Sequence, residues 1–199
     1  MPTWNSLDED SLFDRQLPRS LQLKAECHFT PLEVARRAAR LLAPRRNTTV
    51  LDVGSGAGKF CIEAARVVPT ARFVGIEWRR PLVKIAAHLA RAAAVSNVEF
   101  IHGDALDLDW SEYDAFYLYN PFAEQACREP FVIDTSIALD PRNFGLYVKT
   151  VSKRLADARP GTRVVTYHGF GGPLPEAYRL DHWEDVGSGP LELWIKRRA

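Results

Sequence analysis

The sequence has few cysteines, no long apolar run and no basic, apolar leader. Its three cysteines, Cys27, Cys61 and Cys127, are widely spaced, which argues against a disulfide framework and against a C-x-x-C zinc motif. No apolar run approaches the roughly 18 residues that a membrane span requires, and the first residues lack the layout of a signal peptide. We therefore expect a cytoplasmic protein with reduced thiols, no membrane contact and no bound metal.

The sequence also lacks an excess of charge of either sign. The formal charge is +1 over 199 residues, of which 46% are hydrophobic. This length and composition suit one α/β domain with a sizeable core. A nearly neutral protein does not coat nucleic acid with its whole surface, so any charged partner must meet a local patch.

Arginine is concentrated at two places in the chain. One cluster lies on and just after an expected helix, and the other follows the second expected strand; the residues are Arg36, Arg37, Arg40, Arg45 and Arg46, then Arg79 and Arg80. No aromatic residues are interleaved with them, so a solvated helix face is favoured over a nucleic-acid contact, which stays open.

From residue 48 onward, strand-like and helix-like segments alternate. Two late strands, near 178–186 and 191–196, are joined by Gly187-Ser188-Gly189 as a hairpin. The pattern predicts an α/β sandwich whose sheet has seven strands and is mostly parallel, with the last strand antiparallel. The five earlier strands are expected at 49–53, 72–76, 98–101, 115–119 and 163–167.

Residues 1–46 precede this alternation and predict a helical extension that acts as a lid on the domain of residues 47–199. A short helix is expected at about 7–17, before Pro18. Thr30-Pro31-Leu32-Glu33 has the form of a capping box with proline at the first helical position, which predicts a helix to about Ala43.

A glycine-rich loop, Gly54-Ser55-Gly56-Ala57-Gly58, follows the first strand and begins a helix. Glycines allow the tight turn and the close approach of a ligand that side chains would block. Lys59 stands where G-x-G-x-x-G has its third glycine, which counts against a dinucleotide. We expect Gly54, Ser55, Gly56 and Gly58 to contact a cofactor.

Acidic residues stand at the ends of the first three strands, where ligands bind in such sheets. Asp52 suits a cationic sulfonium cofactor with a free amino group, whereas it would repel a pyrophosphate. Glu77 can accept hydrogen bonds from two ribose hydroxyls. Asp104 can accept from the amine of an adenine, while the backbone of Ala105 reaches a ring nitrogen and Trp78 stacks along the adenine.

Together, the loop and the three acids at residues 48–120 resemble the first motifs of class I, Rossmann-like, S-adenosylmethionine-dependent methyltransferases. The resemblance implies S-adenosyl-L-methionine as cofactor. It also implies that the methyl acceptor lies above the fourth strand, which runs into Tyr119-Asn120-Pro121-Phe122. That segment is similar to the N-P-P-Y/F motif of amino-group methyltransferases, with one proline missing, and to the Asn-x-Phe segment of non-SET lysine methyltransferases. Uncharacterised bacterial relatives carry a similar aromatic-Asn-Pro-Phe stretch.

Asn120, Pro121 and Phe122 are therefore the expected catalytic residues, with Asn120 also near the cofactor. An amide oxygen can orient an amine toward the methyl group, and an aromatic face can pack on the acceptor. The alternative is a turn that ends the strand. His28 and His168 are weaker candidates for a proton acceptor, and His88 is given no role.

The function expected first is N-methylation of an amine, with protein lysine as the favoured acceptor. Methylation of an RNA base or of a small molecule is the alternative within enzymes. An alternative of another class is a protein that binds S-adenosylmethionine or a nucleotide without catalysis. The oligomeric state is left open.

Overall fold

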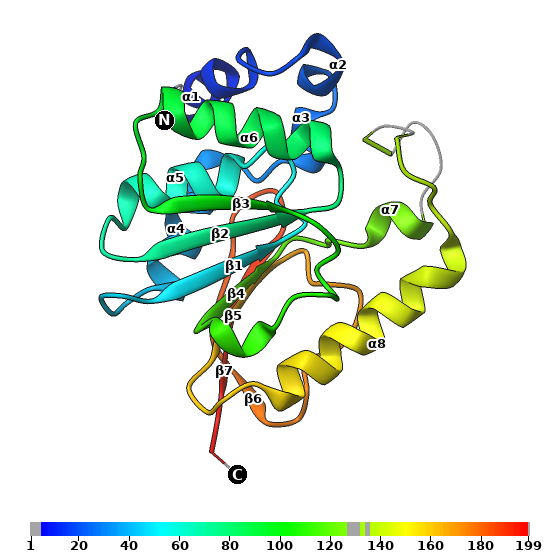
Figure 1. The fold of residues 1–199 in the computed structure, drawn as a ribbon. Helices are drawn as coiled ribbons and strands as arrows, with labels where there is room; N and C mark the ends of the chain where they lie inside the picture. The colour runs from blue at the N-terminus through cyan, green and yellow to red at the C-terminus, as the bar shows by residue number, and fades with distance from the viewer. Residues whose placement is uncertain (1–4, 127–131, 134–135, 199) are drawn as a thin grey trace.

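The computed structural model describes residues 5–126, 132–133 and 136–198 (Figure 1). Cys127 lies outside the described residues. The helices are α1 (Asn5–Asp14), α2 (Arg19–Gln22), α3 (Ala25–His28), α4 (Leu32–Leu42), α5 (Lys59–Val67), α6 (Arg80–Ala92), the 3-10 turn η1 (Trp110–Glu112), α7 (Ala123–Ala126) and α8 (Pro141–Asp157). The strands are β1 (Thr49–Val53), β2 (Arg72–Glu77), β3 (Val98–His102), β4 (Ala115–Leu118), β5 (Arg163–Tyr167), β6 (Tyr178–Asp185) and β7 (Pro190–Lys196).

One seven-stranded sheet runs through the molecule in the order β3-β2-β1-β4-β5-β7-β6. The pairs from β3 to β5 are parallel, whereas β7 is antiparallel to both β5 and β6. The chain order reverses between β1 and β4, so a crevice is expected beyond the carboxyl ends of these strands. The predicted fold class is confirmed, including the single antiparallel last strand.

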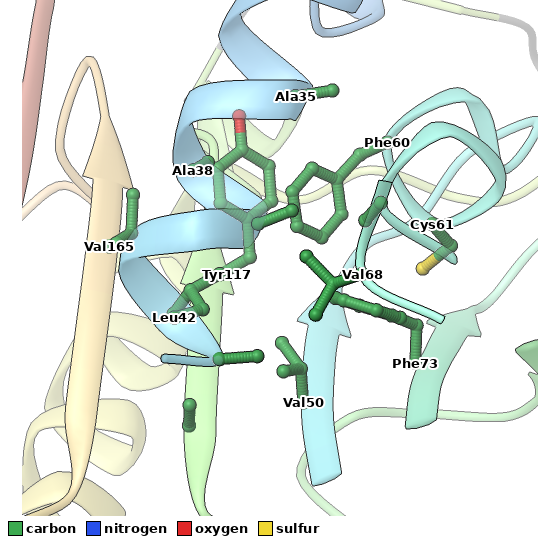
Figure 2. Packing of buried hydrophobic residues seen from close by; sticks show 14 of the residues in the cluster. Ala35, Ala38, Leu42, Val50, Phe60, Cys61, Val68, Phe73, Tyr117 and Val165 are labelled. Atoms are coloured by element: carbon green, nitrogen blue, oxygen red, sulfur yellow. The ribbon is translucent and has the colours of Figure 1, made fainter. Parts of the chain in front are cut away.

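Helices α4 and α5 cover one face of the sheet around a core that includes Tyr117 (Figure 2). The Tyr117 ring stacks on Phe60 with centroids 3.8 Å apart and planes at 11°. Its hydroxyl lies 2.9 Å from Thr30 Oγ1, which gives the fully buried phenol a hydrogen-bond partner. This contact ties the segment before α4 to the sheet.

Helix α8 covers the opposite face (Figure 1). Its Val151 and Leu155 are fully buried against the strands. Beside α8, Trp110 stacks on Phe116 at 4.7 Å and donates its indole N–H to the carbonyl of Ala105 at 2.8 Å. This hydrogen bond fixes the segment after β3, which contains Ala105, one of the expected cofactor residues.

The N-terminal helices lie on the outer side of α5 and α6 (Figure 1). Leu17, Leu21 and Ala25 are buried in this contact. Lys59 is only 3% exposed, and its ammonium forms ion pairs with Asp10 at 2.6 Å and Asp14 at 2.8 Å. Helix α1 is thus attached directly to the residue that follows the glycine loop.

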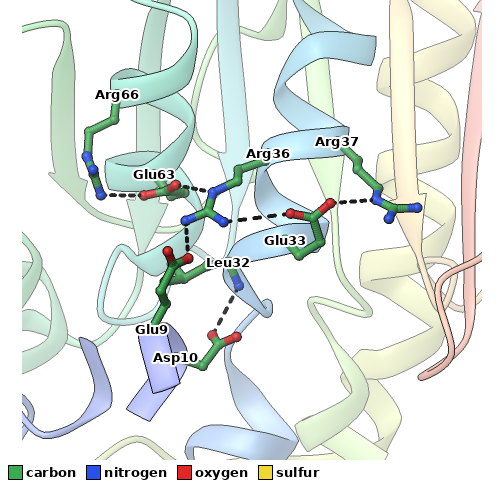
Figure 3. Close-up of polar contacts among 8 residues, drawn as sticks. All are labelled: Glu9, Asp10, Leu32, Glu33, Arg36, Arg37, Glu63 and Arg66. Carbon is green, nitrogen blue, oxygen red and sulfur yellow. Dashed lines mark hydrogen bonds and ion pairs between the residues drawn. The ribbon is translucent and has the colours of Figure 1, made fainter. Parts of the chain in front are cut away.

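Two expectations about this region are wrong in detail. The first helix spans Asn5–Asp14 instead of about 7–17. The capping box at α4 does not form, because the Thr30 hydroxyl pairs with Tyr117 and the helix has no cap from its own side chains. Asp10 of α1 accepts the N–H of Leu32 at 3.1 Å instead, so the cap comes from another helix (Figure 3).

Two arginines of α4, Arg36 and Arg37, are engaged in ion pairs (Figure 3). Arg36 contacts Glu9 at 2.5 Å and Glu63 at 2.6 Å, and Arg37 contacts Glu33 at 3.0 Å and Glu184 at 2.8 Å. These pairs raise the pKa of Arg36 chiefly through the hydrogen bond to Glu63. Within the described residues, no helix is long and apolar enough to cross a membrane.

Candidate active site at the carboxyl ends of the strands

The glycine loop turns sharply between β1 and α5. Gly54, Gly56 and Gly58 have φ of +77°, +55° and +82°, a region that favours glycine. A Cβ at Gly54 would lie 3.3 Å from the Cβ of Pro121, and one at Gly56 would lie 3.0 Å from the Phe29 ring. The loop is therefore approached closely by the segment after β4 and by the segment before α4.

Glu77 ends β2 beside this loop and is 6% exposed. Its Oε2 accepts the N–H of Gly56 at 3.1 Å, and its Oε1 accepts the N–H of Arg79 at 2.7 Å. Burial raises the pKa of Glu77, and the hydrogen bond from Arg79 opposes that rise. Each oxygen holds one backbone donor, so both retain lone pairs for a ligand.

A first cavity opens between the ends of β1, β2, β3 and β4. It measures about 510 Å³ including its solvent-open mouth. Seven of the sixteen residues that line it were expected in the site from the sequence: Gly54, Glu77, Trp78, Asp104, Ala105, Pro121 and Phe122.

Asp104 is held in this cavity by a residue that sequence reasoning missed. Its Oδ2 accepts the hydroxyl of Tyr147 at 2.8 Å, and its Oδ1 accepts the N–H of Leu106 at 2.9 Å. The ring of Tyr147 lies 4.9 Å from Phe122 and 6.3 Å from Trp78. Burial, followed by the bond to Asp104, raises the pKa of Tyr147. The cavity thus combines a positioned carboxylate with an aromatic wall.

A second cavity lies beyond β4 and measures about 790 Å³ on the same basis. The rings of Tyr119 and His168 are 5.8 Å apart at its wall. The Tyr119 hydroxyl donates to the carbonyl of Cys27 at 3.3 Å, and burial raises the pKa of this phenol to about 12. Asn120 also lines this cavity.

Asn120 has a strained backbone, with φ of +40° although it is not glycine and precedes a proline. Its N–H donates to the carbonyl of Gly169 at 2.9 Å, which connects the end of β4 to the loop after β5. His168, which directly precedes Gly169, also has a positive φ, of +57°. Paired left-handed residues at neighbouring strand ends are typical of functional sites.

Glu124 lines both cavities and so lies where they meet. Its Oε2 contacts Nη2 of Arg79 at 2.8 Å, and its Oε1 lies 3.7 Å from Nδ1 of His28. Arg79 is 6% exposed and also lies 3.9 Å from Glu77. Burial lowers the pKa of His28, and Glu124 opposes that effect. A chain of alternating charges therefore runs from the first cavity to the second.

Four of the expected cofactor residues do not line either cavity: Asp52, Ser55, Gly56 and Gly58. Asp52 is 4% exposed and accepts the Cys61 thiol at 3.3 Å, and burial raises its pKa to about 7. Ser55 packs against Gly75, while a Cβ at Gly58 would meet Phe100 at 2.6 Å. The structure thus brings Glu77 and Asp104 to one cavity and places Asp52 beneath the loop.

The histidines considered as proton acceptors can now be located. His28 and His168 line the second cavity, whereas His88 is exposed on α6. Tyr147 and Glu124 were not anticipated, because no local pattern marks them. Arg79 was noted only as part of a basic pair.

Comparison with known proteins finds similarity to methyltransferases in sequence and in fold. Residues 44–130 match the family model described as a methyltransferase domain. The chain carries a class I methyltransferase domain. The recognition made from the glycine loop and the strand-end acids is thereby confirmed, and so is the Rossmann-like fold.

The solved structures to which this fold is similar include an RNA methyltransferase from Salinibacter ruber in complex with S-adenosyl-L-homocysteine. The two share 28% identity with a TM-score of 0.60, over 85% of this chain and 94% of the other. A methyltransferase from Aquifex aeolicus, with 16% identity and a TM-score of 0.55 over 94% of this chain and 97% of the other, shows the fold alone.

Curated relatives match a shorter stretch. The tRNA (guanine-N(7)-)-methyltransferase of Shewanella piezotolerans is 38% identical over 64 residues, which is 32% of this chain and 27% of the relative. The enzyme of the same name from Microcystis aeruginosa is 41% identical over 54 residues, 27% of this chain and 26% of the relative. The chain thus spans about a quarter of the length of these relatives.

Proposed function

We propose that this protein transfers the methyl group of S-adenosylmethionine to a ring nitrogen of an RNA base, with N7 of guanine as first candidate. The tRNA methyltransferases that share a segment with it, and the RNA methyltransferase that shares most of its fold, support an RNA acceptor. The observation that carries the proposal is the second cavity, which adjoins the first through Glu124 and presents aromatic faces.

The residues of the first cavity fit the adenosyl half of the cofactor. Both oxygens of Glu77 are oriented by backbone donors and would accept the two ribose hydroxyls. Asp104 would accept the adenine amine, the backbone of Ala105 would hold a ring nitrogen, and Trp78 would supply an aromatic face beside the ring. When bound, the cofactor supplies a methyl group on a cationic sulfur.

The rest of the cofactor is assigned to the glycine loop. The backbone of Gly54, Ser55 and Gly56 would hold the amino-acid end, and Gly58 permits the turn. Asp52 acts from beneath the loop as a negative charge that favours the cationic cofactor. We further propose that residues 1–46 form the lid, since Phe29 covers Gly56 at close range.

The second cavity suits a planar base. Tyr119 and His168 offer ring faces for stacking, and the amide of Asn120 can orient the acceptor at the cavity wall. Pro121 and Phe122 fix the Asn120 backbone between the two cavities. The N7 atom of guanine carries a lone pair and no proton, so its attack needs no general base.

The charge balance also suits this site. Methylation of a ring nitrogen that carries no proton would leave a positive charge on the base. The carboxylate of Glu124 lies at the junction of the cavities, where it can stabilise a cationic product. Protein lysine, the acceptor favoured from the Asn120-Pro121-Phe122 segment alone, receives no support from the relatives.

The test is incubation of the protein with S-adenosylmethionine labelled in the methyl group and a total cell extract. RNA is expected to carry the label, and reduction followed by aniline cleavage should break the labelled RNA at N7-methylguanine. Label in protein would contradict the RNA assignment. Label in RNA without aniline-sensitive sites would contradict only the choice of N7.

The variant Asn120→Ala separates catalysis from binding. S-adenosylhomocysteine at a hundredfold excess over its Kd should stabilise wild type and variant alike, by about 2.7 kcal/mol. Turnover should fall in the variant alone. Stabilisation of the wild type without any methyl transfer would favour a protein that binds the cofactor without catalysis.

A further inference from the structure

A basic hollow lies at the opposite end of the sheet from both cavities. It is bordered by the residues that precede β1, β4 and β5, and measures about 1020 Å³ including its open mouth. Within the described ranges, its charged lining residues are four arginines and one aspartate. Arg45 and Arg46 come from the α4–β1 loop, Arg159 from the α8–β5 loop and Arg163 from the first residue of β5.

The single acid does not neutralise this surface. Asp114 accepts the N–H of Thr49 at 2.8 Å and pairs with Arg159 at 2.9 Å. Arg45 and Arg46 are exposed, and their side chains have no hydrogen-bond or ion-pair partner among the residues that the structure describes. The hollow is therefore a local excess of positive charge on a protein whose formal net charge is only +1.

Arg163 is held at the base of the hollow. Its Nε donates to the carbonyl of Leu41 at 2.6 Å, which fixes the guanidinium. Burial lowers the pKa of Arg163; Asp181 opposes this, and the charge of Arg45 lowers the pKa further. An anion between Arg45 and Arg163 would relieve their repulsion.

Thr162 gives a second, independent indication of a ligand. It lines the hollow and is 2% exposed, yet its hydroxyl has no hydrogen-bond partner in the described part of the chain. A buried hydroxyl without a partner is uncommon and calls for an explanation. Guanidinium forks and threonine hydroxyls are both frequent donors to phosphate oxygens.

The lining also indicates which part of a nucleic acid would bind. Among the residues that the structure describes, no aromatic side chain lines the hollow to stack on a base, so the contact would be to the backbone. The five residues of β1 separate the hollow from the glycine loop, a span of roughly 17 Å at about 3.3 Å per residue. One nucleotide cannot occupy the second cavity and the hollow together.

We propose that this hollow binds backbone phosphates of the acceptor RNA, so that the substrate is a folded RNA that reaches both ends of the sheet. The inference rests on the proposed function, because it assigns these phosphates to the same RNA that is methylated. It predicts a contribution to affinity that depends on salt and not on base sequence.

The test compares the wild type, the double variant Arg45→Ala/Arg46→Ala and a matched control, Arg66→Ala/Arg91→Ala. The control removes two exposed arginines from α5 and α6, outside the hollow. Binding of the RNA identified by labelling is measured across a range of KCl concentrations, together with kcat and KM. The same measurements are repeated with a trinucleotide that contains the target base and with a mononucleotide.

The hollow variant should bind the long RNA up to about thirtyfold more weakly at 0.15 M salt, and the slope of log K against log salt should fall by about two, as expected for two lost phosphate contacts. KM should rise, whereas kcat and activity on the trinucleotide should not change. The control should keep the wild-type slope. Unchanged melting temperatures would show that the variants remain folded.

Other outcomes overturn the inference in distinguishable ways. If the wild type methylates RNA and the hollow variant keeps its salt slope, the phosphate assignment is wrong and the proposed function stands. If the variant loses mononucleotide binding alone, the hollow holds a free phosphate compound. If the wild type neither binds nor methylates RNA, both proposals fail.

Discussion

Asp52 provides the sharpest test of the site. Its buried carboxylate should destabilise the protein without cofactor, whereas its negative charge should favour binding of the cationic cofactor. Its carboxyl group is fully buried, and desolvation raises its pKa from 3.8 to about 7, against the opposite effect of the hydrogen bond from Cys61. A carboxyl group with a raised pKa contributes stability that is complete below its unfolded value and is lost as pH rises through the folded value. The affected window therefore runs from about pH 4 to about pH 7.

The variant Asp52→Asn keeps the size of the side chain and an oxygen that can accept the Cys61 thiol, but it cannot ionise. The difference between 3.8 and about 7, at about 1.4 kcal/mol per pH unit, amounts to about 4 kcal/mol. The variant should therefore be more stable than the wild type by up to about 4 kcal/mol at pH 8, and about equally stable at pH 4. For a chain of this length, that corresponds to a Tm higher by roughly 8–16 °C at pH 8.

The measurement is denaturant unfolding of both proteins, without cofactor, from pH 4 to pH 9. The exposed Asp157 provides a control, since Asp157→Asn should change the stability only slightly. A constant gap between Asp52→Asn and wild type at every pH would refute the reasoning, because it would show that the buried carboxyl does not titrate in the window. The same variant should bind S-adenosylmethionine more weakly, because it lacks the negative charge that favours the cationic cofactor. The substitution that raises stability would then lower affinity.

Three further changes test the remaining contacts. Tyr147→Phe removes the hydroxyl that positions Asp104, and the Kd for S-adenosylhomocysteine, measured by calorimetry, should rise about fivefold for a loss of about 1 kcal/mol. Lys59→Met removes the buried ammonium that holds α1, which should cost roughly 1–3 kcal/mol and speed proteolysis of α1; equal protease resistance would contradict the attachment. Gly189→Ala places a Cβ 2.1 Å from the His168 ring, so turnover should fall roughly ten- to hundredfold while cofactor affinity persists; unchanged turnover would remove the ring from the acceptor site.

Much of the fold could be predicted because local patterns carry it. Alternating strand and helix segments imply parallel strands, and the carboxyl ends of parallel strands meet at one edge. Glu77 and Asp104, each at the end of a strand, were therefore expected at a common cavity, and they line one. Tyr147 could not be anticipated, because it comes from α8, far along the chain, and reaches Asp104 only through tertiary packing.

Side-chain direction was the harder question. Asp52 shares strand parity with Val50, which packs on the α4–α5 face, so both side chains point to that side, where Cys61 lies. In a strand buried on both faces, hydrophobicity does not reveal this direction. Thr30 shows that capping is equally hard to predict from local sequence. Its hydroxyl could bond either to the first turn of α4 or to a distant group, and it bonds to the Tyr117 phenol.

Lys59 connects these observations, since it stands where a dinucleotide fold has its third glycine. That glycine normally allows the helix to pack closely on the strand. Here a Cβ at Gly58 would lie 2.6 Å from the Phe100 ring and 2.8 Å from the Cβ of Ala86, so Gly58 already has no room for a side chain. Gly58 thus takes the place of the third glycine in this close packing, and position 59 can carry a side chain. Its ammonium reaches outward to Asp10 and Asp14, and the helix that bears those acids also caps α4 through Leu32. Lys59, the residue that departs from the dinucleotide pattern, therefore joins the N-terminal helices to the glycine loop. A displacement of these helices would then displace the loop as well.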